Sequence, residues 1–126
     1  MSAKKKILVI DDEENITRLL KVCLEQTERF EVEVENEPTH AVDKARQFEP
    51  DLILLDVMMP KMDGSVLVNQ FRDSPKLTKV PIVFLTALAT PAEVHQHGGV
   101  IGGLPFLAKP VSIPEVIECL DKQLAA

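Results

Sequence analysis

Residues 52–56 read Leu-Ile-Leu-Leu-Asp, a run of four aliphatic residues that ends on the carboxylate of Asp56. A continuous aliphatic run of this length is typical of a strand buried on both faces, as in the middle of a parallel sheet. Open sheets of this kind bind ligands in the crevice at the carboxyl ends of their strands. The sequence therefore predicts an α/β protein with Asp56 at the ligand-binding edge of its sheet.

Polar residues follow three further apolar runs of the chain. These runs, with the polar residues after them, are 7–10 with Asp11 and Asp12, 82–85 with Thr86, and 106–108 with Lys109. Because the carboxyl ends of parallel strands lie at one edge of a sheet, we expect these side chains to meet Asp56 there. The candidate site thus combines three carboxylates, a hydroxyl and an ammonium.

Amphipathic segments alternate with the apolar runs, which is the pattern of a doubly wound parallel sheet with helices on both faces. Five strands and five helices fit this pattern, and the alternating segment 30–34 is predicted to be an edge strand. The predicted helices cover about 14–27, 38–48, 65–72, 90–97 and a last segment that starts after Ser112.

The first predicted helix carries apolar residues at helical spacing. Its buried face is expected to contain Ile16, Leu19, Leu20 and Cys23. Cys23 and Cys119 lack the spacing of a metal site. We interpret them as small buried hydrophobic residues in a reducing cytosol rather than as a disulfide.

The overall composition is that of one globular domain over residues 1–126. Hydrophobic residues make up 45% of the chain, its net charge is −6, and its pI is about 5.0. An acidic chain cannot neutralise several phosphates, so direct nucleic-acid binding is not expected. The apolar run behind the basic start is shorter than the ~7 residues of a signal peptide, and none approaches the ~18 of a membrane span. We therefore expect a cytoplasmic protein that does not bind a membrane.

The predicted cluster of carboxylates needs a counter-charge. Two carboxylates about 4 Å apart repel each other by roughly 4 kcal/mol at an effective dielectric constant near 20. Lys109 alone cannot balance Asp11, Asp12 and Asp56, whereas a magnesium ion can, because Mg²⁺ prefers oxygen ligands and commonly bridges a carboxylate to a phosphoryl group. The chemistry indicated is phosphoryl transfer, with a carboxylate as the nucleophile.

Each residue of this cluster also has an ordinary structural explanation. Asp11 and Asp12 can cap the following helix, and Asp56 can form an Asx turn at a strand end. Thr86 is a common residue at the end of a strand, and Lys109 can be a surface lysine. The occurrence of all of them at the ends of successive strands favours a shared site.

The motifs as a whole resemble those of the receiver domain of two-component response regulators. They are Asp11-Asp12, Asp56 with the following Val-Met-Met-Pro-Lys-Met-Asp-Gly, Thr86-Ala87 and Lys109-Pro110. The resemblance covers nearly the whole chain. It implies a flavodoxin-like three-layer sandwich with strand order 2-1-3-4-5, and a signalling phosphoacceptor rather than an enzyme with turnover.

The resemblance also implies a role for each matching residue. Asp56 would be the phosphoacceptor, Asp12 and Asp56 would ligate magnesium directly with the backbone carbonyl of Met58, and Asp11 would act mainly through a bound water. The donor would be a phosphohistidine on a sensor histidine kinase or a histidine phosphotransfer protein. A monomer, or a weak dimer that depends on phosphorylation, is expected to act on an unknown downstream protein.

Three further positions are implied to form the switch. Lys109 would pair with a phosphoryl oxygen, and its peptide bond to Pro110 is expected to be cis. Thr86 would move its hydroxyl onto the phosphoryl group, and Phe106 would move inward with it, changing the face of the fourth helix, last strand and last helix. The alternative for Phe106 is a simple core residue of the last strand.

Two regions depart from the family pattern. Segment 97–105 is rich in glycine, which disfavours helix, so the fourth helix should be short and followed by a loop. Met58 and Leu88 lie two residues after Asp56 and Thr86 and cannot orient a water molecule, so the acyl phosphate formed at Asp56 should hydrolyse slowly.

A hydrolase with an Asp nucleophile usually has a general acid where Met58 stands, which disfavours that class. A receiver that binds partners without phosphorylation is disfavoured by the intact acidic cluster.

Overall fold

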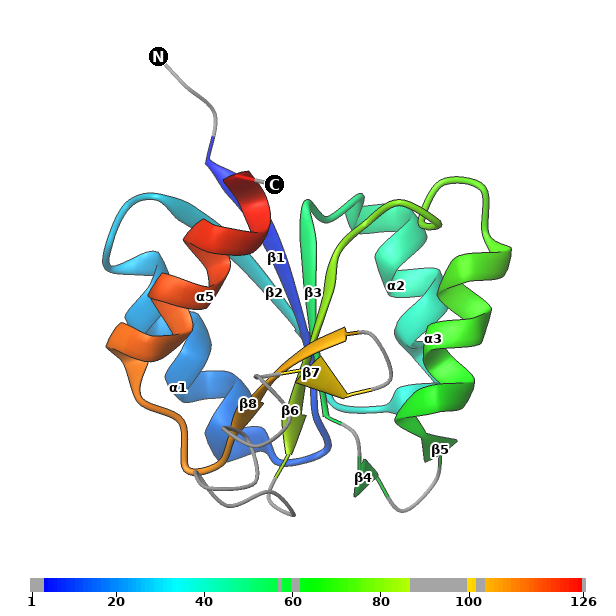
Figure 1. Cartoon of the computed structure of the whole chain (residues 1–126), viewed down its shortest axis with the longest axis horizontal. Coiled ribbons are helices and arrows are strands. Elements are labelled where there is room, and N and C mark those ends of the chain that lie inside the picture. The colour runs from blue at the N-terminus through cyan, green and yellow to red at the C-terminus, as the bar shows by residue number, and fades with distance from the viewer. Residues whose placement is uncertain (1–3, 57, 60–61, 87–99, 102–103, 126) are drawn as a thin grey trace.

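Parallel strands form the centre of the molecule, and helices cover both faces (Figure 1). The computed structural model describes residues 4–56, 58–59, 62–86, 100–101 and 104–125. For 58–59, 62–65, 100–101 and 104 the description covers the backbone alone. The parallel strands are β1 (Lys5–Ile10), β2 (Phe30–Glu35), β3 (Leu52–Asp56), β6 (Ile82–Thr86) and β8 (Leu104–Ala108).

The strand order β2-β1-β3-β6-β8 confirms the predicted 2-1-3-4-5 order, with β2 at one edge. A short strand that was not predicted, β7 (Val100–Ile101), pairs antiparallel with the start of β8. The sequence predicts a loop there, but the β-branched residues Val100 and Ile101 favour an extended backbone. A second small pairing joins β4 (Met58–Met59) to β5 (Met62–Asp63) after β3.

Helices α1 (Glu14–Glu25) and α5 (Ile113–Ala125) cover one face of the sheet (Figure 1). Helices α2 (Ala41–Phe48) and α3 (Gly64–Asp73) cover the other. A 3-10 turn, η1 (Pro38–His40), precedes α2, and the two together span the helix predicted over 38–48. The helix predicted over 90–97 lies outside the described residues. No helix in the described part of the chain is long and apolar enough to cross a membrane.

Strand β3 is buried along its whole length, as its aliphatic run predicts. Alternate residues of β1 and β3 point to opposite faces and enter two separate cores. Ile53 and Leu55 pack with α2 and α3, whereas Leu52 and Leu54 pack with α1 and α5. Each buried aliphatic side chain contributes about 1.5–3 kcal/mol to folding. The strand that ends on Asp56 is therefore held on both faces.

The predicted buried face of α1 is wrong at one position. Leu19 is 47% exposed, and the fully buried residues of α1 are Thr17, Leu20 and Leu24. The spacing allowed two overlapping faces, and the packing of α1 against β2 selects the one that excludes Leu19. Cys23 and Cys119 are free thiols, as predicted, but both are only half-buried.

Candidate functional site

Four predicted site residues lie at the carboxyl edge of the sheet. Asp11 follows β1, Asp56 and Thr86 are the last residues of β3 and β6, and Lys109 follows β8. Backbone hydrogen bonds fix these ends: the amide of Asp11 donates to the carbonyl of Glu35 at 3.2 Å, and that of Lys109 donates to the carbonyl of Thr86 at 2.7 Å. The backbone hydrogen bonds between neighbouring strands thus continue one residue past the ends of β1 and β8 and align the functional residues.

The three aspartates form one group. Ligand oxygen atoms of Asp11, Asp12 and Asp56 all lie within 4.8 Å of one another. Asp11 and Asp56 are buried, whereas Asp12 is exposed. Such a set of oxygen donors, open to solvent on one side, suits a hard cation that keeps several of its waters. The predicted convergence of the carboxylates is therefore observed.

The ammonium of Lys109 is the counter-charge within this group. Its Nζ lies 2.7 Å from Oδ2 of Asp11 and 3.6 Å from Oδ2 of Asp56, and its side chain is only 7% exposed. Burial lowers the pKa of Lys109, but hydrogen bonds to Asp11 and Glu13 and the charges of Asp11 and Asp56 outweigh it and raise the pKa above its ordinary value. The amine therefore stays protonated beside the acids.

One buried oxygen indicates that this arrangement suits a further cation. Among the described residues, Oδ2 of Asp11 is a fully buried side-chain oxygen that accepts no hydrogen bond of normal geometry. It lies 2.7 Å from the ammonium of Lys109, in an ion pair. A buried carboxylate oxygen in this state is costly. The donor set therefore fits a divalent ion in addition to the ammonium.

A fourth carboxylate, that of Glu13, was missed by the sequence reasoning. Its Oε1 lies 3.0 Å from Nζ of Lys109, across 96 residues of sequence. The available signal was its place as the third consecutive acid after Asp11 and Asp12. Its reach toward Lys109 depends on the loop that joins β1 to α1.

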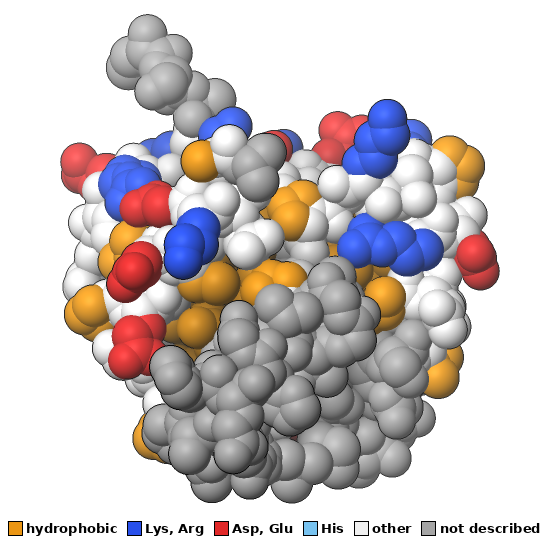
Figure 2. Space-filling model, viewed as in Figure 1, with side chains coloured by type: hydrophobic (Ala, Val, Ile, Leu, Met, Phe, Trp, Pro, Cys, Tyr) orange, Lys and Arg blue, Asp and Glu red, His pale blue; other side chains and the backbone are white. Residues whose placement is uncertain are grey.

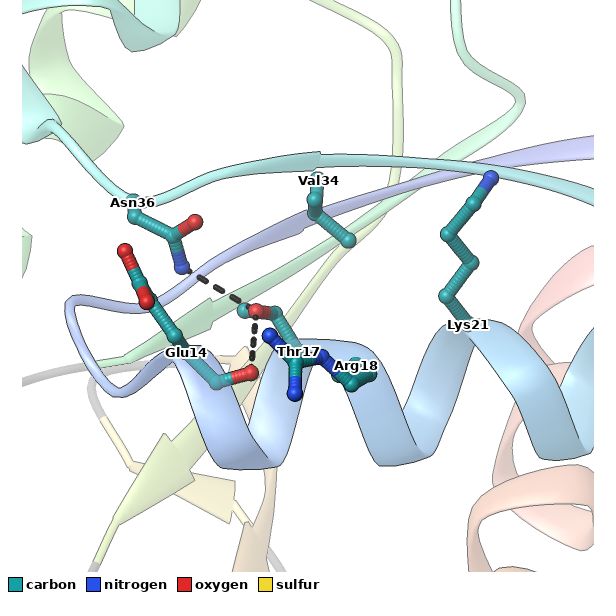
Figure 3. Close-up of a pocket in the computed structure, with 6 residues that line it drawn as sticks. All are labelled: Glu14, Thr17, Arg18, Lys21, Val34 and Asn36. Atoms are coloured by element: carbon teal, nitrogen blue, oxygen red, sulfur yellow. Dashed lines mark hydrogen bonds between the residues drawn. The ribbon is translucent and has the colours of Figure 1, made fainter.

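Asn36 is a second residue that was not predicted. Its side-chain amide donates to the carbonyl of Asp11 at 2.8 Å and to the hydroxyl of Thr17 at 3.0 Å. Figure 3 shows Asn36 and Thr17 in a pocket of about 340 Å³ between α1 and β2, with Glu14 and Arg18 beside them. Asn36 thus ties the end of β2 to the loop that carries the acids.

The two predicted switch residues are both buried. Thr86 ends β6 and Phe106 is 3% exposed within β8, where it pairs with Phe84. Phe106 packs in the core that α2 and α3 cover. Its backbone neighbours also line a groove of about 370 Å³ along β8 and the start of α5, and hydrophobic side chains gather beside α5 on the face in Figure 2. This position suits both an inward switch residue and a simple core residue.

Three other predictions concern the peptide bond before Pro110 and the positions of Met58 and Leu88. The peptide bond between Lys109 and Pro110 is cis, as expected. Met58 lies in β4, two residues after Asp56. Leu88 lies outside the described residues.

Comparisons with known proteins agree with this geometry. The model of the response regulator receiver domain family matches residues 7–121. The chain is 40% identical over 113 residues to the alkaline phosphatase synthesis transcriptional regulatory protein PhoP of Bacillus subtilis, covering 89% of this chain and 45% of that protein. It is 40% identical over 111 residues to the response regulator PleD of Caulobacter vibrioides, covering 88% of this chain and 24% of PleD.

A solved structure extends the similarity to the fold. The chemotaxis protein CheY4 of Vibrio cholerae superposes with a TM-score of 0.81 at 30% identity, covering 96% of this chain and 99% of CheY4. By contrast, the chain spans less than half the length of PhoP and PleD. The matched segment contains every residue of the acidic edge, from Asp11 to Lys109. On the family match, the fold and the site together, this chain belongs to the response regulator receiver domains of two-component signalling.

Proposed function

We propose that this receiver domain takes a phosphoryl group from a phosphohistidine onto Asp56. In this step the P–N bond of the donor breaks, a P–O bond to a carboxylate oxygen of Asp56 forms, and the imidazole keeps the electron pair and is protonated. The observation that carries the proposal is the state of Asp56. It is 2% exposed, it ends a strand buried on both faces, and its Oδ2 lies 3.6 Å from the Lys109 ammonium.

A magnesium ion is the cofactor that fits the carboxylates. Asp12, Asp56 and the carbonyl of Met58 would hold it directly, and Asp11 would do so mainly through water. The ion supplies positive charge for the oxygens of the transferring phosphoryl group. The fit is supported by the 4.8 Å grouping of the carboxylate oxygens and by the unsatisfied Oδ2 of Asp11.

Lys109 and Thr86 would act on the phosphoryl group once it is attached. The ammonium would pair with a phosphoryl oxygen, and the hydroxyl of Thr86 would donate a hydrogen bond to another. We propose that the inward state of Phe106 is then favoured, which changes the face that includes β8 and α5. A difference of about 5.5 kcal/mol in how strongly the phosphoryl group interacts with the two states would convert a 1:99 population to 99:1.

The partners follow from this chemistry. The donor is a sensor histidine kinase or a histidine phosphotransfer protein, and the output is contact with a downstream protein by a monomer or a weak phosphorylation-dependent dimer. We propose that residues 1–126 form one receiver domain that acts in the cytoplasm, with self-catalysed phosphotransfer and slow self-hydrolysis as its only chemistry. Many relatives carry this domain as part of a longer protein, which the 24% share of PleD illustrates.

Acetyl phosphate and magnesium test the proposal directly. We expect one added phosphoryl group by mass spectrometry in the wild type and in Asp51→Asn, and complete loss of it in Asp56→Asn. Asp51 is the matched control because it lies at the other end of the same strand, exposed, with its Oδ2 on the amide of Lys6. Continuous release of phosphate would instead indicate a hydrolase, and no uptake by the wild type would indicate a receiver that works without phosphorylation.

A further inference from the structure

Glu13 stands at the start of α1 but does not use its side chain to cap the helix. Its backbone is extended, with φ −86° and ψ 103°, and its side chain accepts no capping hydrogen bond. The backbone carbonyl of Glu13 already accepts from the amides of Ile16 and Thr17 at 3.1 and 3.2 Å. Its carboxylate is therefore available for the contact with Lys109.

A backbone contact joins Glu13 to the carboxylate of Asp11. The amide of Glu13 donates to Oδ1 of Asp11 at 2.9 Å, while Oδ2 of Asp11 meets the ammonium of Lys109. Glu13 and Asp11 are thus joined to each other and to the same lysine. The loop places two carboxylates around one side of that ammonium.

The distances show which side holds the lysine. Nζ of Lys109 is 2.7 Å from Asp11 and 3.0 Å from Glu13, but 3.6 Å from Asp56. Glu13 is also the contact that water can replace at little cost, since its side chain is 55% exposed. The ammonium therefore lies closer to Asp11 and Glu13 than to the phosphoacceptor, with which it still forms an ion pair.

We propose that Glu13 is a positioning residue that holds Lys109 in the unphosphorylated protein and competes with the phosphoryl group for it. This inference rests on the proposed phosphorylation of Asp56. When the P–O bond to Asp56 forms, Lys109 turns to a phosphoryl oxygen and the carboxylate of Glu13 returns to water. Glu13 thereby favours the resting state and slows phosphorylation.

The main test compares Glu13→Gln with Glu14→Gln, which removes the same charge one residue further along. Glu14 lies toward the pocket between α1 and β2 (Figure 3). With acetyl phosphate and magnesium, Glu13→Gln should take up the phosphoryl group about two- to fivefold faster than Glu14→Gln, the range expected for an exposed ion pair. The advantage should shrink in 0.5 M salt, where such pairs are screened.

A second measurement does not depend on phosphorylation. The ¹⁵N resonance of the Lys109 ammonium in magnesium-free protein should shift in Glu13→Gln and stay in place in Glu14→Gln. A merely structural role for Glu13 would move the thermal melting point without giving faster uptake. Equal or slower uptake in Glu13→Gln than in Glu14→Gln overturns this inference, whereas no uptake by the wild type overturns the phosphoacceptor proposal instead.

Discussion

Asp51 and Asp56 flank the same buried run, one before Leu52 and one after Leu55. Asp51 is exposed, and its Oδ2 accepts a 2.8 Å hydrogen bond from the amide of Lys6. Asp56 is buried and faces a lysine ammonium and two further carboxylates. One carboxylate fastens β3 to β1, and the other lies in a charged crevice. Position along a strand, rather than residue type, separates a structural aspartate from one in the candidate site.

Lys6, near Asp51, and Lys109, near Asp56, differ in the same way. Nζ of Lys6 donates to the carbonyl of Phe48 at 3.3 Å and lies over its ring, whereas Nζ of Lys109 is surrounded by carboxylates. A buried charge that loses its partner is costly, whereas an exposed contact is not. The comparison therefore predicts unequal losses when each lysine is replaced.

The largest effect on stability is expected for Lys109→Met. In magnesium-free buffer near pH 7 it should lower the free energy of unfolding by about 3 kcal/mol, because the carboxylates of Asp11 and Asp56 lose their buried counter-charge. Lys6→Met should cost about 1 kcal/mol, the value of one hydrogen bond. Urea unfolding followed by circular dichroism measures both, and equal losses for the two variants would contradict the comparison.

Magnesium should reveal the same asymmetry with a smaller effect. At ten times its dissociation constant, the ion should raise the free energy of unfolding by about 1.4 kcal/mol, because it binds only the folded state. Asp12→Asn should reduce this gain strongly, and Asp51→Asn should leave it unchanged. Thermal melting with and without MgCl₂ measures it, and a gain that survives in Asp12→Asn would place the ion elsewhere.

Much of this arrangement was predictable from the sequence. The aliphatic run of β3 fixed a buried central strand, and the rule that parallel strands share a carboxyl edge brought Asp11, Asp56, Thr86 and Lys109 together. These predictions depend only on strand direction and burial, and the local hydrophobic pattern of the sequence is a good indicator of both. The sheet order came from the family resemblance.

Features that depend on loop path or on neighbouring helices were not predictable. Glu13 reaches Lys109 only because the loop after β1 turns its side chain back across the site. Leu19 and Leu20 are equally apolar, and only the packing of α1 decides that Leu19 is exposed. Strand β7 forms through its antiparallel pairing with β8. Such contacts are set by tertiary structure, which periodicity does not encode.

The smallest expected effect concerns Cys119, a half-buried thiol outside the group of carboxylates that surrounds Lys109. Burial raises the pKa of the Cys119 thiol, nearby Lys122 lowers it, and Glu118 raises it again. At Lys109 burial acts against the charged form as well, but the carboxylates outweigh it. At Cys119 burial is thus the largest cause of the raised pKa, and it acts in the direction of the shift.

The sign of the pH dependence follows from the raised pKa. The folded protein keeps the thiol proton at pH values where the unfolded chain, with an ordinary thiol pKa of about 8.5, has begun to lose it. The stabilising contribution is therefore complete below about pH 8 and is lost as the pH rises through the folded pKa. Between pH 7.5 and 10.5 the urea midpoint of the wild type should fall more than that of Cys119→Ala. Parallel curves would contradict a raised pKa at Cys119.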